Sequence, residues 1–252
     1  MTRADSAEPL LSIVIPAYNE GRRLGPALAQ IREYLERTGT TAEIIVVDDG
    51  STDDTAEVAE RFDPGAIPLR VFRNDGNRGK GYSVRRGFLA AAGKLLLMTD
   101  ADQSTPLWEI EKLTPHLEAG CKVVIGSREL PDSEVSPPQG WPRRVLGKLL
   151  RLVRGWIMLH DIRDTQCGFK CFTREAGRRI FARLKTRRFA FDCEALLLAR
   201  KLGYRICEVG VVWCNDRDSR VRLVRDSLEM IVSLVRIRWR LRRVAAEAPD
   251  AA

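Results

Sequence analysis

The order of strand and helix signals in the first half of the chain is the feature that most narrowly limits its fold. Short apolar runs, each closed by Pro, Asp, Asn or Gly, are typical of buried strands. They lie at Leu11–Ile15, Glu43–Val47, Leu69–Phe72, Leu95–Met98 and Lys122–Ile125. Because strands that alternate with helices form parallel sheets covered on both faces, this order predicts an α/β fold with a mostly parallel central sheet.

Helices are predicted in the gaps between these runs. Leucine or isoleucine at positions 24, 28, 31 and 35 lies on one face of a helix, and Gly39 follows as its C-cap. Composition alone predicts further helices at Asp53–Arg61, Tyr82–Ala92 and Leu107–Glu118. We therefore expect residues 11–126 to form one unit, preceded by a disordered N-terminus at residues 1–10.

The pattern changes after residue 126. A loop rich in proline and polar residues precedes a basic helix expected at about 142–160, and an arginine-rich helix begins at about 219. Between them lie the segment DIRDTQCGFKCFTREA, a helical segment FAFDCEALLLARKLG and a strand RICEVGVVW. We expect residues 127–244 to form a second half with basic amphipathic helices, and residues 245–252 to form a frayed tail.

The chain has a net charge of +8, and its basic residues concentrate in the second half. This excess predicts a polyanionic partner such as nucleic acid, a phosphorylated ligand or anionic lipid. Nucleic acid is disfavoured, because no nucleic-acid-binding module is recognised. On the last helix, apolar side chains and arginines together suit either an anionic membrane surface or packing on the core. That apolar stripe comprises Val224, Leu228, Ile231, Val235 and Trp239.

No apolar run reaches the roughly 18 residues needed to cross a membrane. The six cysteines contain no C-x-x-C pair and the chain has only two histidines, so a zinc site is disfavoured. We expect reduced, mostly buried thiols, and a cytoplasmic protein that associates peripherally with the inner face of a membrane. The cysteines are Cys121, Cys167, Cys171, Cys193, Cys207 and Cys214.

Acidic side chains follow three of the predicted strands, at the point where each strand ends. Glu20 follows the first, Asp48 and Asp49 the second, and Asp100 and Asp102 the fourth. Ligands of parallel sheets bind outside the carboxyl ends of the strands, so we expect these acids to converge on one crevice. Neighbouring carboxylates repel each other without a cation, and Mg²⁺ or Mn²⁺ with a diphosphate suits them. Taken alone, each pair of acids has an alternative to metal binding, because acids after a strand also cap helices or are solvated.

Two further segments favour a nucleotide ligand. Tyr18 can stack on a base, and Glu20 can accept hydrogen bonds from the base or the ribose. The segment NDGNRGKGYS places glycines, Arg78 and Lys80 at a loop-to-helix junction, which favours phosphate. Neither a Walker motif nor a G-x-G-x-x-G motif after the first strand is present, which disfavours kinases, ATPases and dehydrogenases.

Five motifs in order, SIVIPAYNE, IIVVDDGSTDDT, GNRGKGYSVRRGF, TDADQSTP and IGSR, resemble family 2 glycosyltransferases. The segments IRDTQCGFKCFTREA and RRFAFDCEALLLARKLGY resemble the dolichyl-phosphate β-glucosyltransferases and the dolichyl-phosphate mannose synthases. The resemblance covers about residues 11–240. It implies a single Rossmann-like domain of the GT-A type, in which residues 11–126 bind a nucleotide-diphospho-sugar and residues 127–244 bind the acceptor.

The activity implied by this resemblance is metal-dependent, inverting transfer of a hexose to a polyprenyl phosphate. Glucose from UDP-glucose is favoured. The alternatives are a GDP-mannose-dependent mannosyltransferase, a soluble family 2 enzyme acting on a hydroxyl, and a catalytically inactive sugar-nucleotide sensor. The implied partners are the donor, the lipid phosphate and an anionic membrane surface, and a membrane-protein partner is left open.

The resemblance also assigns site residues by position. The residues that match nucleotide contacts in the family are Pro16, Tyr18 and Glu20 for the base and ribose, and Val47 and Asp49 as a second pair. The residues that match the segment along the diphosphate and metal are Asp100, Ala101 and Asp102. The residues that match phosphate-contacting arginines are Arg128, Arg217 and Arg220. The local sequence adds Lys80 for phosphate and Asp192 for donor-sugar hydroxyls. We expect the catalytic contribution to come from Asp100, Asp102, Arg128 and Arg220.

The expected metal, Mg²⁺ or Mn²⁺, has Asp100, Asp102 and Gln103 as its candidate ligands. Mannose synthases usually carry a metal-binding Gln two residues beyond the second Asp, where this chain has Ser104. Gln103 stands one position earlier. This departure favours the glucosyl subgroup over the mannosyl subgroup.

Overall fold

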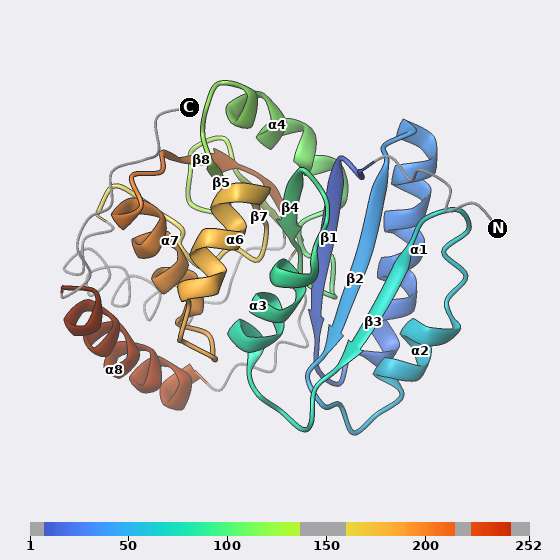
Figure 1. Cartoon of the computed structure of the whole chain (residues 1–252), viewed down its shortest axis with the longest axis horizontal. Helices are drawn as coiled ribbons and strands as arrows, with labels where there is room; N and C mark the ends of the chain where they lie inside the picture. Colours follow the sequence, from blue (N-terminus) through green and yellow to red (C-terminus); the bar gives the residue numbers. More distant parts are fainter. Residues whose placement is uncertain (1–7, 137–159, 215–222, 243–252) are drawn as a thin grey trace.

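The computed structural model describes residues 8–136, 160–214 and 223–242 (Figure 1). Its central sheet has seven strands in the order β3-β2-β1-β4-β7-β5-β8. They are β1 (Leu11–Ala17), β2 (Ala42–Asp48), β3 (Leu69–Arg73), β4 (Leu95–Met98), β5 (Val123–Ser127), β7 (Lys170–Thr173) and β8 (Ile206–Gly210). All neighbours are parallel except β7, which runs antiparallel to β4 and β5. This confirms the predicted α/β fold and mostly parallel sheet.

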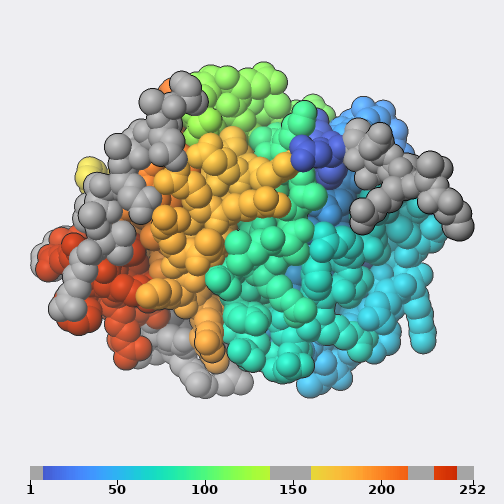
Figure 2. Space-filling model, in the orientation of Figure 1, coloured from blue at the N-terminus to red at the C-terminus, as the bar shows by residue number. Residues whose placement is uncertain are grey.

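Helices cover both faces of the sheet (Figure 1). They are α1 (Gly21–Thr38), α2 (Thr55–Arg61), α3 (Lys80–Ala90), the 3-10 helix η1 (Leu107–Glu109), α4 (Ile110–Glu118), α6 (Arg174–Arg183), α7 (Phe191–Lys201) and α8 (Leu223–Arg242). One face packs against α1 and α4, and the other against α3, α6 and α7. Figure 2 shows this second face, where α3, α6 and α8 lie at the surface.

The core joins the first and second halves of the chain. Every residue of β2 is buried, as expected for a strand with helices on both faces. Phe88 of α3 packs against Phe172 of β7 and Phe181 of α6, and the centroids of these three rings lie 4.2 to 5.5 Å apart. Because β7, α6 and β8 complete the same sheet and core, the second half shares the central sheet of the first.

The segment RICEVGVVW forms two strands rather than one. β8 belongs to the central sheet, whereas β9 (Val212–Cys214) pairs with β6 (Glu134–Ser136) in a separate two-stranded sheet. Val211 links the two sheets, because its N–H donates to the Ser127 carbonyl (3.1 Å) and its carbonyl accepts from the Glu134 N–H (3.2 Å). The prediction of a single strand was wrong because the chain changes hydrogen-bonding partners at this residue.

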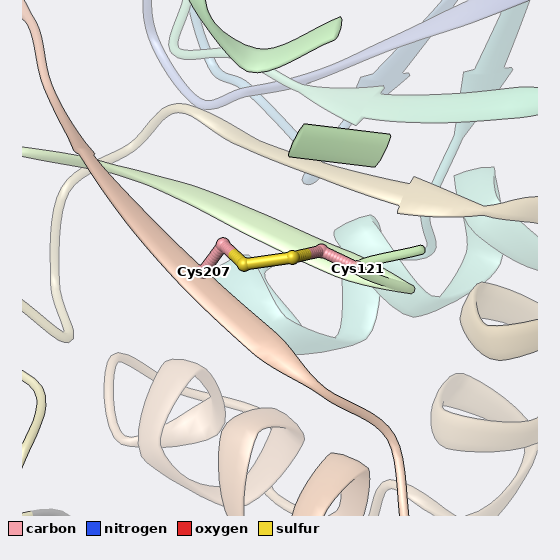
Figure 3. The surroundings of a disulfide bond; sticks show 2 residues. All are labelled: Cys121 and Cys207. Atoms are coloured by element: carbon pink, nitrogen blue, oxygen red, sulfur yellow. A yellow bond between two sulfur atoms is a disulfide. The ribbon is translucent and has the colours of Figure 1, made fainter. Parts of the chain in front are cut away.

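The expectation that all six cysteines are reduced is wrong for one pair. Cys121, just before β5, forms a disulfide with Cys207 of β8 (Figure 3). The two strands are neighbours, which brings the Cα atoms of residues 86 positions apart to within 6.1 Å. Three other cysteines are buried thiols as expected, namely Cys167, Cys171 and Cys193, whereas Cys214 is exposed. Burial raises the pKa of the Cys171 thiol to about 12.

The last helix has two apolar faces. Its core face comprises Met230, Leu234, Ile237 and Leu241, all buried. A second set is exposed, namely Val232 (48%), Val235 (59%) and Trp239 (61%). The five residues of the predicted apolar stripe therefore differ in exposure. Val235 and Trp239 are exposed, and Ile231 is half-buried. The side chains of Val224 and Leu228 lie outside the described residues. Packing on the core uses a different set of side chains from the predicted one.

Some expectations fall on parts of the chain that the structure does not describe. These are residues 1–7, the basic helix expected at about 142–160 except for residue 160, Arg217, Arg220 and the tail at residues 245–252. Leu10, within the N-terminus that we expected to be disordered, donates its N–H to the Thr41 carbonyl (2.9 Å). Within the described ranges, no helix is long and apolar enough to cross a membrane.

Candidate active site

The loops that follow β1 and β2 are hydrogen-bonded to each other. Asn19, in the left-handed region with a φ of 55°, accepts the Thr52 N–H with its Oδ1 (2.8 Å). The Glu20 N–H donates to Thr55 Oγ1 (2.7 Å). These bonds hold the exits of the first two strands together, with Tyr18 39% exposed at the end of β1. An exposed aromatic ring at a strand exit is suited to stacking on a nucleotide base.

The two acids after β2 have different partners. Asp48 accepts the Ser51 N–H (3.1 Å), which forms an Asx turn. Asp49 is buried and accepts from Asn74 Nδ2 (2.8 Å), the Arg78 N–H (2.9 Å) and the Gly79 N–H (2.7 Å). Three charge-assisted hydrogen bonds tie the Asp49 carboxylate to the glycine-rich loop. Asp49 therefore fixes the loop that leads into α3.

Gly79 allows the start of α3 to pass close to the second half of the chain. Its φ of 98° lies in the left-handed region, and an added Cβ would lie 2.5 Å from the Arg187 carbonyl oxygen. The next residue, Lys80, is the first of α3 and reaches the fourth strand exit. There its Nζ lies 2.5 Å from Oδ1 of Asp100.

Lys80 is surrounded by carboxylates. Burial alone lowers the pKa of a lysine. Here that effect is outweighed by the negative charges of Asp100, Asp192 and Asp102, which raise the pKa of Lys80 above its ordinary value. Lys80 is therefore a fixed positive charge at this end of the sheet.

Asp102 is the less restrained of the two acids after β4. Its Oδ1 accepts the Ser104 N–H (2.9 Å), and the residue as a whole is exposed. Burial of its carboxylate and the negative charge of Asp100 raise the pKa of Asp102. A cation beside the two acids would offset both effects, because it favours the ionised form.

Gln103, the residue that follows this pair in the sequence, has a third candidate oxygen. It is buried with a φ of 48°, and its Nε2 donates to the Asp100 carbonyl (3.2 Å). Its Oε1 is buried and accepts no hydrogen bond from the described residues. Two carboxylates and an orphaned amide oxygen are hard donors that fit Mg²⁺ or Mn²⁺. The described residues hold no group of three or more His, Cys, Asp or Glu side chains suited to a metal, so diphosphate and water would have to complete the shell.

Arg128, just beyond β5, is held by a partner that sequence reasoning missed. Asp164 accepts from Arg128 Nε (2.6 Å) and Nη2 (3.0 Å), and it is almost completely buried. The guanidinium also lies 5.3 Å from the centroid of the Trp213 ring. The Arg128 charge holds the pKa of Asp164 below its ordinary value against the opposing effect of burial. The sequence signal that could have identified Asp164 is the DTQCGFK segment, which begins with this acid.

Asp192 and Glu194, the two acids at the start of α7, are both buried. Asp192 lies 2.6 Å from Nζ of Lys170, which is equally buried and also donates to a backbone carbonyl. Burial raises the pKa of Asp192 despite this lysine. Glu194 accepts the Thr186 N–H (2.7 Å) and an ion pair from Arg240 of α8. Asp192 thus lies among the charges that act on Lys80, whereas Glu194 joins α7 to α8.

Comparison with known proteins assigns the chain to a family. The model of "Glycosyl transferase family 2" matches residues 12–182, which is more than half of the chain. The chain belongs to glycosyl transferase family 2. It is 37% identical to "Dolichyl-phosphate beta-glucosyltransferase" of Dictyostelium discoideum, over 91% of this chain and 74% of that protein. It is 36% identical to the Homo sapiens protein of the same name, over 94% of this chain and 77% of that protein.

Solved structures of glycosyltransferases share the fold. Glucosyl-3-phosphoglycerate synthase from Mycobacterium tuberculosis, in complex with Mn²⁺, UDP and glucosyl-3-phosphoglycerate, has a TM-score of 0.70 at 19% identity, over 91% of this chain and 80% of that chain. Mannosyl-3-phosphoglycerate synthase from Rubrobacter xylanophilus has a TM-score of 0.67 at 24% identity, over 93% and 75% of the two chains. This confirms the GT-A type fold that the motifs implied.

In this family 2 glycosyltransferase, the structure shows where several of the predicted site residues lie. Pro16 and Val47 lie opposite each other in the register of β1 and β2, and the Val47 side chain is buried in the core. Ala101 is buried between the two acids. Lys80, Asp100 and Asp192 are brought together by α3, β4 and α7. Arg217 and Arg220 lie outside the described residues, so their assignment stays a prediction.

Proposed function

We propose that this chain transfers glucose from UDP-glucose to a polyprenyl phosphate, with inversion, to give a β-linked lipid-phosphate sugar. The names and extended similarity of the dolichyl-phosphate β-glucosyltransferases support the sugar and the acceptor class. The observation that carries the proposal is the pair Asp100 and Asp102 at the exit of β4, with Lys80 paired to Asp100 and an orphaned amide oxygen on the adjacent Gln103.

Each part of the donor has a suitable group. Tyr18 offers an exposed ring for the uracil, and Glu20 an acceptor for the base or ribose. Mg²⁺ or Mn²⁺, when bound by Asp100, Asp102 and Gln103, supplies positive charge against the diphosphate. Lys80 and Arg128 are further cations for the phosphates, and Arg128 uses Nε and Nη2 of its guanidinium for Asp164. Pre-positioned cations stabilise the charge that develops on a leaving diphosphate.

No dedicated catalytic base is needed for this acceptor. A phosphate monoester has a second pKa near about 6, so it is already anionic at neutral pH. Its oxygen attacks the anomeric carbon directly, the bond to the diphosphate breaks, and the configuration inverts. The protein's contribution is then positioning and electrostatic stabilisation of the leaving group. For Asp192, which is paired with Lys170 and whose charge acts on Lys80, the proposed contribution is through Lys80 or the donor sugar.

The donor is tested with a panel of radiolabelled nucleotide sugars. Purified protein, Mg²⁺ and a polyprenyl phosphate are incubated with UDP-glucose, GDP-mannose, UDP-galactose or UDP-N-acetylglucosamine, and label is counted in the butanol-extractable lipid. We expect UDP-glucose to be used at least about tenfold faster than the others, a barrier difference of about 1.4 kcal/mol. Preference for GDP-mannose would instead support the mannosyl alternative.

We infer that α8 brings the protein to the inner, cytoplasmic face of a membrane. Its exposed apolar set, Val232, Val235 and Trp239, has the exposed Arg236 and Arg242 on the same helix. Tryptophan with aliphatic and cationic neighbours suits an anionic interface. Each arginine contributes on the order of 1 kcal/mol near such a surface, and the attraction decays within a Debye length of about 8 Å at physiological salt.

Vesicle sedimentation tests this membrane contact. We expect binding to vesicles with anionic lipid to fall steeply as salt is added, and to fall further in the double variant Val235→Ser, Trp239→Ser. Trp108→Ser is the matched control, because Trp108 is also exposed (50%) but lies on η1. Unchanged binding in the double variant would contradict the role of α8. Absence of vesicle binding by the wild type would point to a membrane-protein partner.

A further inference from the structure

The pairing of β4 with β7 sets a glycine opposite one of the candidate metal ligands. These strands run antiparallel, with Met98 opposite Lys170. Two residues beyond Met98, and two before Lys170, the same register sets Asp100 opposite Gly168. Directly opposed residues of an antiparallel pair direct their side chains to the same face, with Cβ atoms about 4.5–5.5 Å apart. The side chain of Asp100 is therefore directed toward the position that a side chain at residue 168 would take.

The structure shows that the carboxylate fills this position. A Cβ added to Gly168 would lie 2.5 Å from Cγ of Asp100, 3.1 Å from its Oδ1 and closer still to its Oδ2. Real Cβ atoms do not approach other atoms so closely. The three nearest atoms all belong to this one carboxylate, so the absence of a side chain at Gly168 serves Asp100 specifically.

Lys80 holds the same carboxylate by its other oxygen. Its Nζ binds Oδ1 of Asp100, whereas Oδ2 is the atom nearest the missing side chain of Gly168. The Asp100 side chain is 35% exposed, so it has room to adopt another rotamer if either contact is changed. Its observed orientation thus depends on the glycine at one oxygen and the lysine at the other.

We propose that Gly168 is a positioning residue for Asp100. The glycine lets the carboxylate lie against the backbone that leads into β7, where it can act together with Asp102 on a metal-bound diphosphate. An alanine at this position would force Asp100 into another rotamer and separate the two acids. The metal step of this inference rests on the proposed function, whereas the contact between Gly168 and Asp100 does not.

A melting-temperature cycle tests the contact without any ligand. It compares the wild type, Gly168→Ala, Asp100→Ala and the double variant. In the wild-type background we expect Gly168→Ala to lower the melting temperature by at least about 2 °C, because it overpacks a filled site. In the Asp100→Ala background, where the carboxylate is gone, we expect little or no further loss. Equal losses in both backgrounds would overturn the proposal.

Binding of Mn²⁺ in the presence of UDP tests the consequence for the metal. The free ion is measured by electron paramagnetic resonance, and we expect the apparent Kd to rise at least about tenfold in Gly168→Ala. Gly25→Ala on α1 is the control, because its added Cβ would make an ordinary 3.5 Å contact with Val58. An unchanged Kd in Gly168→Ala would overturn the positioning role. Absence of Mn²⁺ binding by the wild type would overturn the proposed metal site, and the temperature cycle would still decide the contact.

Discussion

Asp102→Ala is expected to lower glycosyl transfer by at least about 100-fold without unfolding the protein. The substitution removes one of the two carboxylates proposed to hold the metal, and such losses act on the transition state. Asp102 as a whole residue is exposed, and its described hydrogen bonds come from neighbouring Ser104, so the core is not disturbed. Radiolabel transfer to lipid measures the loss, and more than about a tenth of wild-type activity would contradict the assigned role.

The stability of the same variant provides a second, independent readout. The pKa of Asp102 is raised in the folded protein, by burial and by the charge of Asp100. An acid whose folded pKa is raised destabilises the fold once the pH exceeds that pKa, because its ionised form is then disfavoured. Without metal, Asp102→Ala should therefore melt no lower than the wild type at neutral pH. With UDP already present, addition of Mn²⁺ should raise the stability of the wild type only. Asp63→Ala is the matched control, because the Asp63 side chain is 86% exposed and is not among the proposed site residues.

Lys170→Met is expected to lower the free energy of unfolding by about 3–5 kcal/mol. It leaves the carboxylate of Asp192 buried without its cation, which is the costly way to break a buried ion pair. Urea denaturation at pH 7 measures the change. The deficit should shrink as the pH falls, because the pKa of Asp192 is already raised and protonation removes the buried charge.

Replacing both members of this pair separates lost charge compensation from lost packing. The double variant Lys170→Met, Asp192→Leu removes both charges, so it should recover most of the stability that the single variant loses. It should not recover transfer activity if Asp192 contributes to the site. A single-variant loss below about 1 kcal/mol would show that the pair is not an important part of the fold.

The parts of the fold that could be predicted from the sequence are those marked by an apolar run or by a capping residue. β1, β2 and β4 are mostly apolar runs with polar residues soon after them, and α1 is followed by Gly39, which adopts the left-handed conformation of a C-cap (φ of 64°). The acids at the strand exits could be placed because parallel strands end at the same edge of the sheet.

The parts that could not be predicted depend on contacts distant in sequence. β7 is only four residues long and gains its place from pairing with β4 and β5 on either side. On α8, two apolar sets share one helix, so spacing alone could not decide which set packs on the core. Arg240 forms an ion pair with buried Glu194, so it is part of the α7–α8 contact, which residue spacing along the helix could not predict.

The most direct test of the central claim compares a lipid phosphate with the corresponding alcohol as acceptor. The wild-type protein, Mg²⁺ and UDP-[¹⁴C]glucose are incubated with a polyprenyl phosphate or with the polyprenol of the same chain length, and label is counted in the butanol phase. Because the site is proposed to lack a catalytic base, only the already anionic phosphate should be glucosylated. Cleavage of the bond between phosphate and lipid in the product should then release glucose phosphate with a β linkage. Equal labelling of the alcohol, or label confined to water-soluble products with both lipids, would contradict the account.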